Sequence, residues 1–246
     1  MLSLKIAVAI LSLAGVTIAQ DLTPIPGGKS GDGVTTRYWD CCAPSCAWYP
    51  RIHTQNGVPI QTCKADGVTP SDKDLNAQSG CEVGGVAYTC TNQSPKIINE
   101  TLAYTFVAAS FAGGLDYADC CICLVMDFKG KLAGKRLLAQ VTNTGEALGQ
   151  NHFDIQMPGG GVGIYNLGCK TQWNAPDDGW GERYGGVTDI KGCKQLPEQL
   201  QEGCRFRFTW MKGVPNPPVS FYQIKCPEYF VGVSKCGDLF VKELTN

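Results

Sequence analysis

The stretch Thr35-Thr36-Arg37-Tyr38-Trp39-Asp40-Cys41-Cys42 carries most of the information in this sequence, because it sets one aspartate between aromatic residues and adjacent cysteines. A second stretch, Asn151-His152-Phe153-Asp154, again places an aspartate next to an aromatic residue. Glycoside hydrolysis needs two carboxyl groups, one protonated to release the leaving sugar oxygen and one ionised to activate water or attack the sugar. Aromatic side chains add flat apolar surfaces against which sugar rings can stack. Together the two stretches predict a polysaccharide hydrolase.

The cysteines predict an exported, cross-linked domain. The chain has 14 of them, an even number, and they run from Cys41 to Cys236 without a cysteine-free half. Such usage is typical of disulfide-bonded proteins from oxidising compartments. The adjacent pairs Cys41-Cys42 and Cys120-Cys121 each tie one segment to two different neighbours, since adjacent cysteines rarely bond each other. The spacing alone leaves the connectivity open.

Residues 1–19 have the pattern of a secretory signal peptide. Lys5 precedes a short apolar run, Ile6 to Leu13, and Thr17-Ile18-Ala19 is a small-residue cleavage pattern. The apolar run is too short to span a bilayer. We therefore expect a secreted protein, cleaved after Ala19, with residues 20–246 forming a single catalytic domain.

Charge and composition exclude several partners. The chain has 21 Lys and Arg residues against 22 Asp and Glu residues, and the basic residues are scattered, so nothing indicates nucleic acid. No linker is found, so we expect no appended carbohydrate-binding module. The sequons at Asn92 and Asn99 are candidate glycosylation sites, and Pro95 directly after the first favours Asn99.

The periodicity of apolar residues predicts a mainly β protein, a barrel with a few helices and long glycine-rich loops. The expected strands are Cys121–Phe128, Leu137–Thr142, Arg205–Trp210 and Val219–Lys225. The expected helices are Asn99–Phe111 and a short one at Pro197–Gln201.

Three other chemistries lack their sequence signals. The two histidines, His53 and His152, have no metal-ligand spacing, and the cysteines are expected in disulfides, so we predict no metal and no cofactor. The glycine run Gly159 to Gly163 lacks the spacing of a phosphate-binding loop and is interpreted as tight turns forming a flexible groove edge. The Gly-x-Ser-x-Gly motif of serine esterases is absent.

The stretch Thr35 to Cys46 resembles the signature of glycoside hydrolase family 45, small secreted endo-β-1,4-glucanases. The signature is a small residue, Thr-Arg-Tyr, an aromatic residue, Asp, five residues, then Cys or Ala, and the chain fits it at every position. The resemblance covers roughly Gly33 to Cys236. It continues in Ser79-Gly80-Cys81-Glu82, Gly84 to Tyr88, Asn151 to Asp154, Pro158 to Ile164 and Arg183-Tyr184-Gly185-Gly186.

The resemblance implies an inverting hydrolase of internal β-1,4-glucosidic bonds, with Asp40 as general base and Asp154 as general acid. Inversion then requires carboxyls roughly 6.5–9.5 Å apart, with room for the attacking water. The pKa of Asp154 would have to be raised, and packing by Phe153 and its neighbours could provide the desolvation.

The resemblance also implies a six-stranded double-psi β-barrel with long loops and seven disulfides. By family correspondence the expected pairs are Cys41–Cys169, Cys42–Cys81, Cys46–Cys120, Cys63–Cys90, Cys121–Cys236, Cys123–Cys226 and Cys193–Cys204.

Substrate-binding candidates follow from the same resemblance. Tyr38 and Trp48 are expected sugar platforms, with Tyr38 beside the scissile bond, and Thr36, His152 and Glu146 are further candidates. For Trp39 we expect core packing, while Trp173 and Trp180 are assigned to the groove because their loop is rich in Gly, Pro and Asp.

The chain departs from the family in the loop before the acid. Many members carry an aspartate seven residues before the acid, whereas this chain has Ala147 there and Glu146 one place earlier.

Three alternatives stay open at this point. The same chemistry could act on xyloglucan or a mannan such as glucomannan, and pocket shape would decide between these backbones. A non-hydrolytic, expansin-like carbohydrate-binding protein would share the barrel, but expansins lack the base aspartate that Asp40 supplies here. A disulfide-rich structural or defence protein would leave the complete first motif unexplained. The default partner is a β-1,4-glucan, and the default state is a monomer.

Overall fold

The computed structural model describes residues 21–48, 58–71, 76–113, 117–145 and 149–237. Seven strands form one sheet: β1 (Ser30–Tyr38), β2 (Lys96–Ile97), β3 (Leu102–Ser110), β4 (Cys123–Phe128), β5 (Arg136–Thr144), β6 (His152–Gln156) and β7 (Pro218–Ile224). The helices of this part are α1 (Leu167–Trp173), α2 (Glu198–Thr209) and α3 (Glu228–Ser234), with short 3-10 turns such as η1 (Ser45–Ala47). None of these helices is long and apolar enough to cross a membrane.

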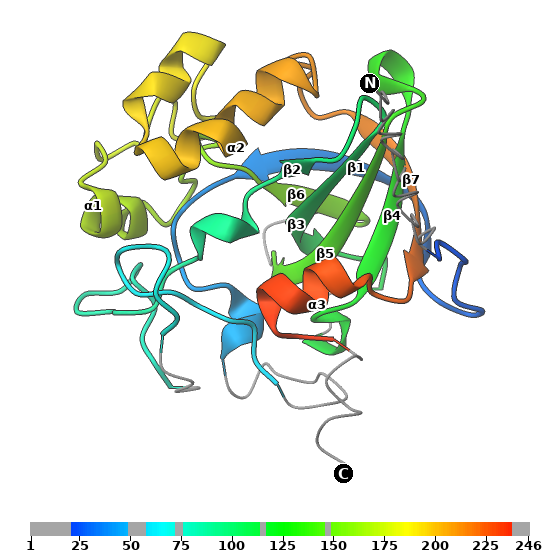
Figure 1. Cartoon of the computed structure of the whole chain (residues 1–246), viewed down its shortest axis with the longest axis horizontal. Coiled ribbons are helices and arrows are strands. Elements are labelled where there is room, and N and C mark those ends of the chain that lie inside the picture. Colours follow the sequence, from blue (N-terminus) through cyan, green and yellow to red (C-terminus); the bar gives the residue numbers. More distant parts are fainter. Residues whose placement is uncertain (1–20, 49–57, 72–75, 114–116, 146–148, 238–246) are drawn as a thin grey trace, which may run out of the picture.

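Six of the strands close into a barrel, as expected (Figure 1). The order is β3-β5-β4-β7-β1-β6, and an additional pairing of β6 with β3 closes the ring, while β2 adds to β3. The pairs β1–β6 and β3–β5 are parallel, and the other barrel pairs are antiparallel. Because closure leaves each barrel strand with two neighbours, Asp154 in the middle of β6 is held from both sides.

Alternate residues of the strands build two apolar layers. Val107, Leu124 and Phe153 belong to the largest buried cluster, which Phe206 and Trp210 extend on the side of α2. Phe106 and Val125, on the opposite faces of their strands, pack in another cluster with Phe230 of α3. The barrel wall is therefore apolar on both faces, with α3 lying across β5 and β4 in Figure 1.

Two secondary-structure predictions were wrong, and one was too short. The segment expected as a helix at Asn99–Phe111 is strand β3, because a strand buried on both faces gives a continuous apolar run that also matches helical spacing. The alternating segment Arg205–Trp210 belongs largely to α2. Phe206 faces the barrel while Phe208 packs against a second cluster. Burial on two sides of the helix therefore gives an alternating apolar pattern like that of a strand. The short helix expected at Pro197–Gln201 is the beginning of α2.

Seven disulfides join all 14 cysteines, in the same pairs that the family resemblance implies: Cys41–Cys169, Cys42–Cys81, Cys46–Cys120, Cys63–Cys90, Cys121–Cys236, Cys123–Cys226 and Cys193–Cys204. Each adjacent pair bonds two separate partners, as expected. Cys41 and Cys121 have φ values of 65° and 71°, a left-handed conformation that turns the chain between neighbouring cysteines. The disulfides therefore fix the loops that follow β1 and precede β4.

Candidate active site

The parallel pairing of β1 with β6 brings the two sequence motifs together. Thr36 of β1 lies opposite Asp154 of β6, and Val34 lies opposite His152. Because side chains alternate across a strand, Thr36 and Tyr38 project on the same side, and Thr36 meets the side chain of Asp154 there. Asp40 lies two residues beyond the end of β1.

Thr36 links the candidate acid to the histidine. Its hydroxyl donates to Asp154 Oδ1 at 2.6 Å and lies 2.8 Å from His152 Nε2. A threonine hydroxyl has one proton, so if it donates to Asp154, His152 must donate its Nε2–H to Thr36 Oγ1. Burial lowers the pKa of His152, which favours this neutral form of the ring. The network therefore holds one oxygen of Asp154 and leaves the other for chemistry.

Asp154 is half-buried, and burial raises its pKa to about 6. The hydrogen bond from Thr36 and the positive charge of Arg37 act in the opposite direction and lower the pKa. A carboxyl with such a pKa can still hold a proton at mildly acidic pH, as a general acid must.

Asp40 is buried, with 8% of its surface exposed. Burial raises its pKa to about 7, the hydrogen bond that its Oδ1 accepts from the Cys42 backbone N–H at 2.9 Å lowers it, and the charge of Asp154 raises it. The two carboxyls thus lie close enough to influence each other. The negative charge of Asp154 disfavours ionisation of Asp40, so the pair favours a state in which it holds one proton.

Tyr38 lies near both carboxyls. Burial raises its pKa well above the ordinary value for tyrosine, and the negative charges of Asp40 and Asp154 raise it further. Its hydroxyl oxygen accepts a hydrogen bond of 3.1 Å from Asn143 Nδ2. Tyr38 therefore remains a neutral phenol near the two acids, and its position beside the scissile bond stays a prediction.

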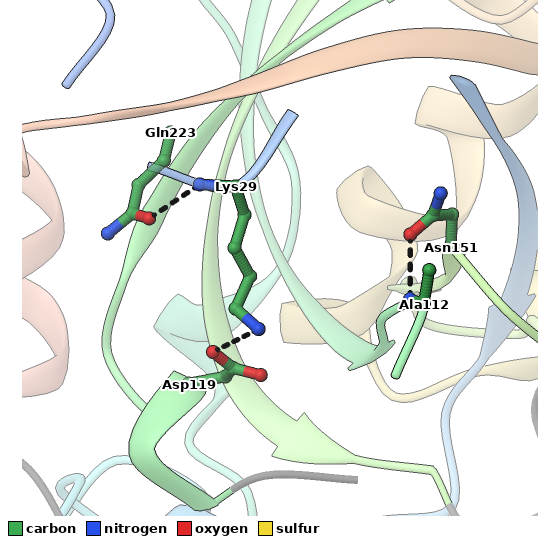
Figure 2. A network of polar contacts seen from close by, with 5 residues as sticks. All are labelled: Lys29, Ala112, Asp119, Asn151 and Gln223. Carbon is green, nitrogen blue, oxygen red and sulfur yellow. Dashed lines mark hydrogen bonds and ion pairs between the residues drawn. The ribbon is translucent and has the colours of Figure 1, made fainter. Parts of the chain in front are cut away.

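A left-handed asparagine fixes the entry of β6. Asn151 has a φ of 49°, donates through Nδ2 to Asp32 O at 3.0 Å and accepts at Oδ1 from Ala112 N at 2.9 Å. Figure 2 shows the Asn151–Ala112 contact together with Lys29, which forms a 2.9 Å ion pair with Asp119. The strand that carries Asp154 is thus tied to β1 and to the end of β3 before its first ladder pair.

The glycine run after β6 is packed, which corrects its interpretation as a flexible groove edge. Gly160 and Gly161 are buried, and Trp39 N donates to Gly161 O at 2.8 Å. A Cβ atom on Gly160 would lie 2.9 Å from Tyr38 N, and one on Gly161 would lie 2.7 Å from Gly185 N. These glycines allow the close approach of three backbone segments behind Tyr38.

The tryptophans divide differently from the expectation for the loop. Trp39 is buried with 2% exposure, as expected. Trp180 is buried in the same cluster at 6% exposure, so its assignment as an exposed platform was wrong, and the half-buried Trp173 packs against that cluster. Trp48 is half-buried against the Cys46–Cys120 cluster, and its role as a sugar platform stays a prediction.

Several expected features fall outside the described residues or outside the site. Glu146, Ala147 and His53 lie outside the described residues. Elsewhere, a cavity of about 750 Å³ is lined by residues that include Lys64, Ser71 and Tyr88, and neither Asp40 nor Asp154 lines it.

The acidic and sulfur atoms near Asp40 do not form a metal site. Asp40, Cys42 and Cys81 lie close together, but the two sulfurs are joined in a disulfide and cannot act as thiolate ligands. No cofactor is needed for an acid–base pair of this kind.

The sequence did not indicate two polar residues of this site. Asn143 of β5 reaches Tyr38, and Arg207 of α2 shares the Gly185 carbonyl with Arg37, at 2.9 Å and 3.1 Å respectively. Both contacts join segments far apart in the chain, so no local pattern signals them. The only sequence signal for Asn143 is that it lies two residues before Gly145, close to the loop of Glu146.

Comparison with known proteins gives one consistent family. The model of glycosyl hydrolase family 45 matches residues 32–237. An endoglucanase of Phaedon cochleariae is 48% identical over 226 residues, covering 92% of each chain. An endoglucanase of Cryptopygus antarcticus is 46% identical over 230 residues, covering 93% of this chain and 96% of the relative.

A solved structure extends the likeness to three dimensions. The crystal structure of a cellulase from the Antarctic springtail Cryptopygus antarcticus has a TM-score of 0.79 and 46% identity, covering 86% of this chain and 99% of that one.

Proposed function

We propose that this chain, which belongs to glycosyl hydrolase family 45, is an endo-β-1,4-glucanase. In this proposal Asp154 and Asp40 perform an inverting single displacement. The family, the two endoglucanases and the cellulase support the activity and a β-glucan substrate. The observation that carries the residue assignment is the meeting of two carboxyls with raised pKa values, one on β6 and one just beyond β1.

In the proposed step the bond between the anomeric carbon and the leaving oxygen breaks as a water oxygen bonds to the anomeric carbon from the opposite face. Asp154 gives its proton to the leaving oxygen, and Asp40 takes a proton from the water. One proton is lost and one is gained, so the pair returns to its starting charge with the proton moved to Asp40.

The electrostatics favour this division of roles once substrate is bound. In the free protein the pKa of Asp40 is the higher of the two. Asp40 is already buried, whereas Asp154 is only half-buried, so a bound sugar desolvates Asp154 more than Asp40. Desolvation raises the pKa of a carboxyl, so substrate binding favours the proton on Asp154.

The proposal also includes secretion, domain organisation and oligomeric state. Residues 1–19 act as a signal peptide, residues 20–246 form one catalytic domain, and the protein is secreted as a monomer. The seven disulfides are consistent with an extracellular protein. Both sequon asparagines, Asn92 and Asn99, are exposed, which leaves them accessible to glycosylation.

The test is reducing-sugar release by the purified protein on carboxymethylcellulose, amorphous cellulose, xyloglucan and glucomannan, with Asp40→Ala as the control. Release from a cellulosic substrate that is lost in the control supports the proposal. Release only from xyloglucan or glucomannan keeps the mechanism and changes the substrate. Binding without release from any of them would contradict the proposal and favour an expansin-like binder.

A further inference from the structure

Asn143 joins three parts of the candidate site. It lies on β5 next to Thr144, it is half-buried, and its side chain contacts both η1, which follows Asp40, and Tyr38. We propose that Asn143 is a positioning residue that turns the hydroxyl of Tyr38 into a hydrogen-bond donor toward an oxygen of the bound glucan. This inference rests on the proposed function and deepens it.

The orientation of the Asn143 amide is fixed by its neighbours. Its Oδ1 accepts from two backbone N–H groups, those of Ser45 and Thr144, each at 3.0 Å. A flipped amide would place NH₂ against both of these donors, which cannot accept. The oxygen therefore faces Ser45 and Thr144, and the NH₂ group faces Tyr38.

The direction of the Tyr38 proton follows from this orientation. Asn143 Nδ2 donates to Tyr38 Oη at 3.1 Å, so the phenol accepts on that side and its own hydrogen must point elsewhere. Within the described residues Asn143 is the one hydrogen-bond partner of this hydroxyl. The hydrogen is thus available to a ligand.

The position of Tyr38 indicates which ligand receives that hydrogen. Tyr38 shares a strand face with Thr36, whose hydroxyl is bonded to Asp154, and it precedes Asp40 by two residues. Its phenol therefore lies where the sugar must be held for the two carboxyls to act. Sugar hydroxyl and ring oxygens accept hydrogen bonds from a neutral phenol, and a phenol fixed in direction costs less rotational freedom on binding.

The chain offers an isosteric test of this orientation. Asn143→Asp keeps an oxygen for the Ser45 and Thr144 N–H groups but replaces the NH₂ donor by a carboxylate oxygen, which accepts. Tyr38 then donates to position 143 and is withdrawn from the glucan. We expect kcat/KM on a soluble cello-oligosaccharide to fall about tenfold, the size expected for one neutral hydrogen bond.

A double-mutant cycle with Tyr38→Phe separates this role from a structural one. In the Tyr38→Phe protein no hydroxyl remains to be oriented, so adding Asn143→Asp is expected to change kcat/KM less than twofold. Asn166→Asp is the control for an Asn-to-Asp change elsewhere on the surface, because the Asn166 amide donates to Asp177 O in an exposed contact outside the site, and its loss should leave kcat/KM unchanged. Equal losses from Asn143→Asp in both Tyr38 backgrounds, or no loss in the wild type, would overturn the inference.

The same cycle measured as affinity keeps the inference testable apart from the reaction. In an Asp154→Asn background, calorimetry with the cello-oligosaccharide should show that Tyr38→Phe and Asn143→Asp each weaken binding about tenfold and are not additive. Additive losses, or no binding of the oligosaccharide at all, would contradict it. If the wild-type protein shows no turnover while the two substitutions still weaken binding non-additively, the proposed reaction is wrong and this inference stands.

Discussion

The two aspartates that we propose as acid and base are held in different ways. Asp154 lies within a strand, opposite Thr36 of β1 on one side and opposite Ala108 of β3 on the other. Asp40 lies in an irregular segment just before two bonded cysteines, the left-handed Cys41, which is joined to Cys169, and Cys42, which is joined to Cys81. Backbone pairing positions the proposed acid, and covalent cross-links position the proposed base.

The difference teaches that one site can combine two kinds of rigidity. A barrel strand fixes a side chain through its register, which every neighbouring pair of residues shares. A loop has no such register, and disulfides together with burial replace it. We therefore expect changes to the barrel and changes to the cross-links to affect the two aspartates separately.

The largest expected effect comes from removing either carboxyl. Asp154→Asn and Asp40→Asn should each lower kcat on β-1,4-glucan by about 10³-fold, within the range for a general acid or base. An aryl β-glucoside whose leaving group needs no protonation tells them apart in a steady-state assay. Its hydrolysis should recover in Asp154→Asn and stay low in Asp40→Asn. Recovery only in Asp40→Asn would exchange the assigned roles, and recovery in both or in neither would remove them.

The buried base should also cost stability at neutral pH. The folded-state pKa of Asp40 is raised to about 7, above about 3.9 in an unfolded chain, so its favourable contribution is present below about pH 4 and lost as the pH rises toward 7. Asp40→Asn does not ionise and avoids this loss. Its unfolding free energy relative to wild type should rise between pH 4 and pH 8 by at most about 4 kcal/mol.

Chemical denaturation at both pH values measures this difference. A constant difference between Asp40→Asn and wild type across that range would show that Asp40 is not buried in the way described. Asp40→Asn is expected to be inactive but more stable than the wild type at neutral pH. Both results together would show that the ionisable Asp40 lowers the stability of the wild-type protein while it serves the reaction.

Removal of the cross-link beside the base comes next. The Cys42–Cys81 bond closes a separation of 39 residues, and the double serine variant should lose about 3–4 kcal/mol of stability. Since Cys42 N donates to Asp40, kcat should also fall about tenfold at temperatures where the variant is folded.

The Cys193–Cys204 bond is the matched control. It closes a separation of 11 residues and does not contact Asp40, so its removal should cost about 3 kcal/mol and leave kcat within twofold. Equal effects of both double variants on kcat would mean that the cross-link at Cys42 does not position the base.

The smallest effect is expected at Thr36. Thr36→Val removes the hydroxyl that lowers the pKa of Asp154, so the pKa of the acid should rise and kcat should fall a few-fold. The pH profile of kcat/KM should keep its shape while the limb that belongs to Asp154 moves to higher pH. Thr36→Ser should restore the wild-type profile, and a profile unchanged by Thr36→Val would remove Thr36 from the acid's network.

The family resemblance predicted the barrel, and it rests on short motifs that keep their order in the chain; the pairing of β1 with β6 brings the two aspartate motifs together. The sequence predicted the strands at Cys121–Phe128 and Val219–Lys225 to within two residues. The predictions for Asn99–Phe111 and Arg205–Trp210 were wrong. Both segments are buried on two sides, which gives the strand an apolar pattern that fits a helix and the helix an alternating pattern that fits a strand.

The polar contacts around the aspartates were less predictable. The bond between Thr36 and Asp154 needs the register of β1 with β6, and the bond between Asn143 and Tyr38 needs the closed barrel. Neither can be obtained from spacing along one segment. The packing of Gly160 and Gly161 against Tyr38 and Gly185 also becomes visible only when the loops are placed together.

The anomeric form of the first product tests the central assignment most directly. Proton NMR of a cello-oligosaccharide, recorded in the first moments after enzyme is added, distinguishes the α from the β form of the newly released reducing end. Single displacement with Asp154 as acid and Asp40 as base predicts that the α form appears first and converts slowly to the equilibrium mixture. A product that first appears in the β form would contradict this account, because it would require a covalent intermediate and a nucleophile in place of a base.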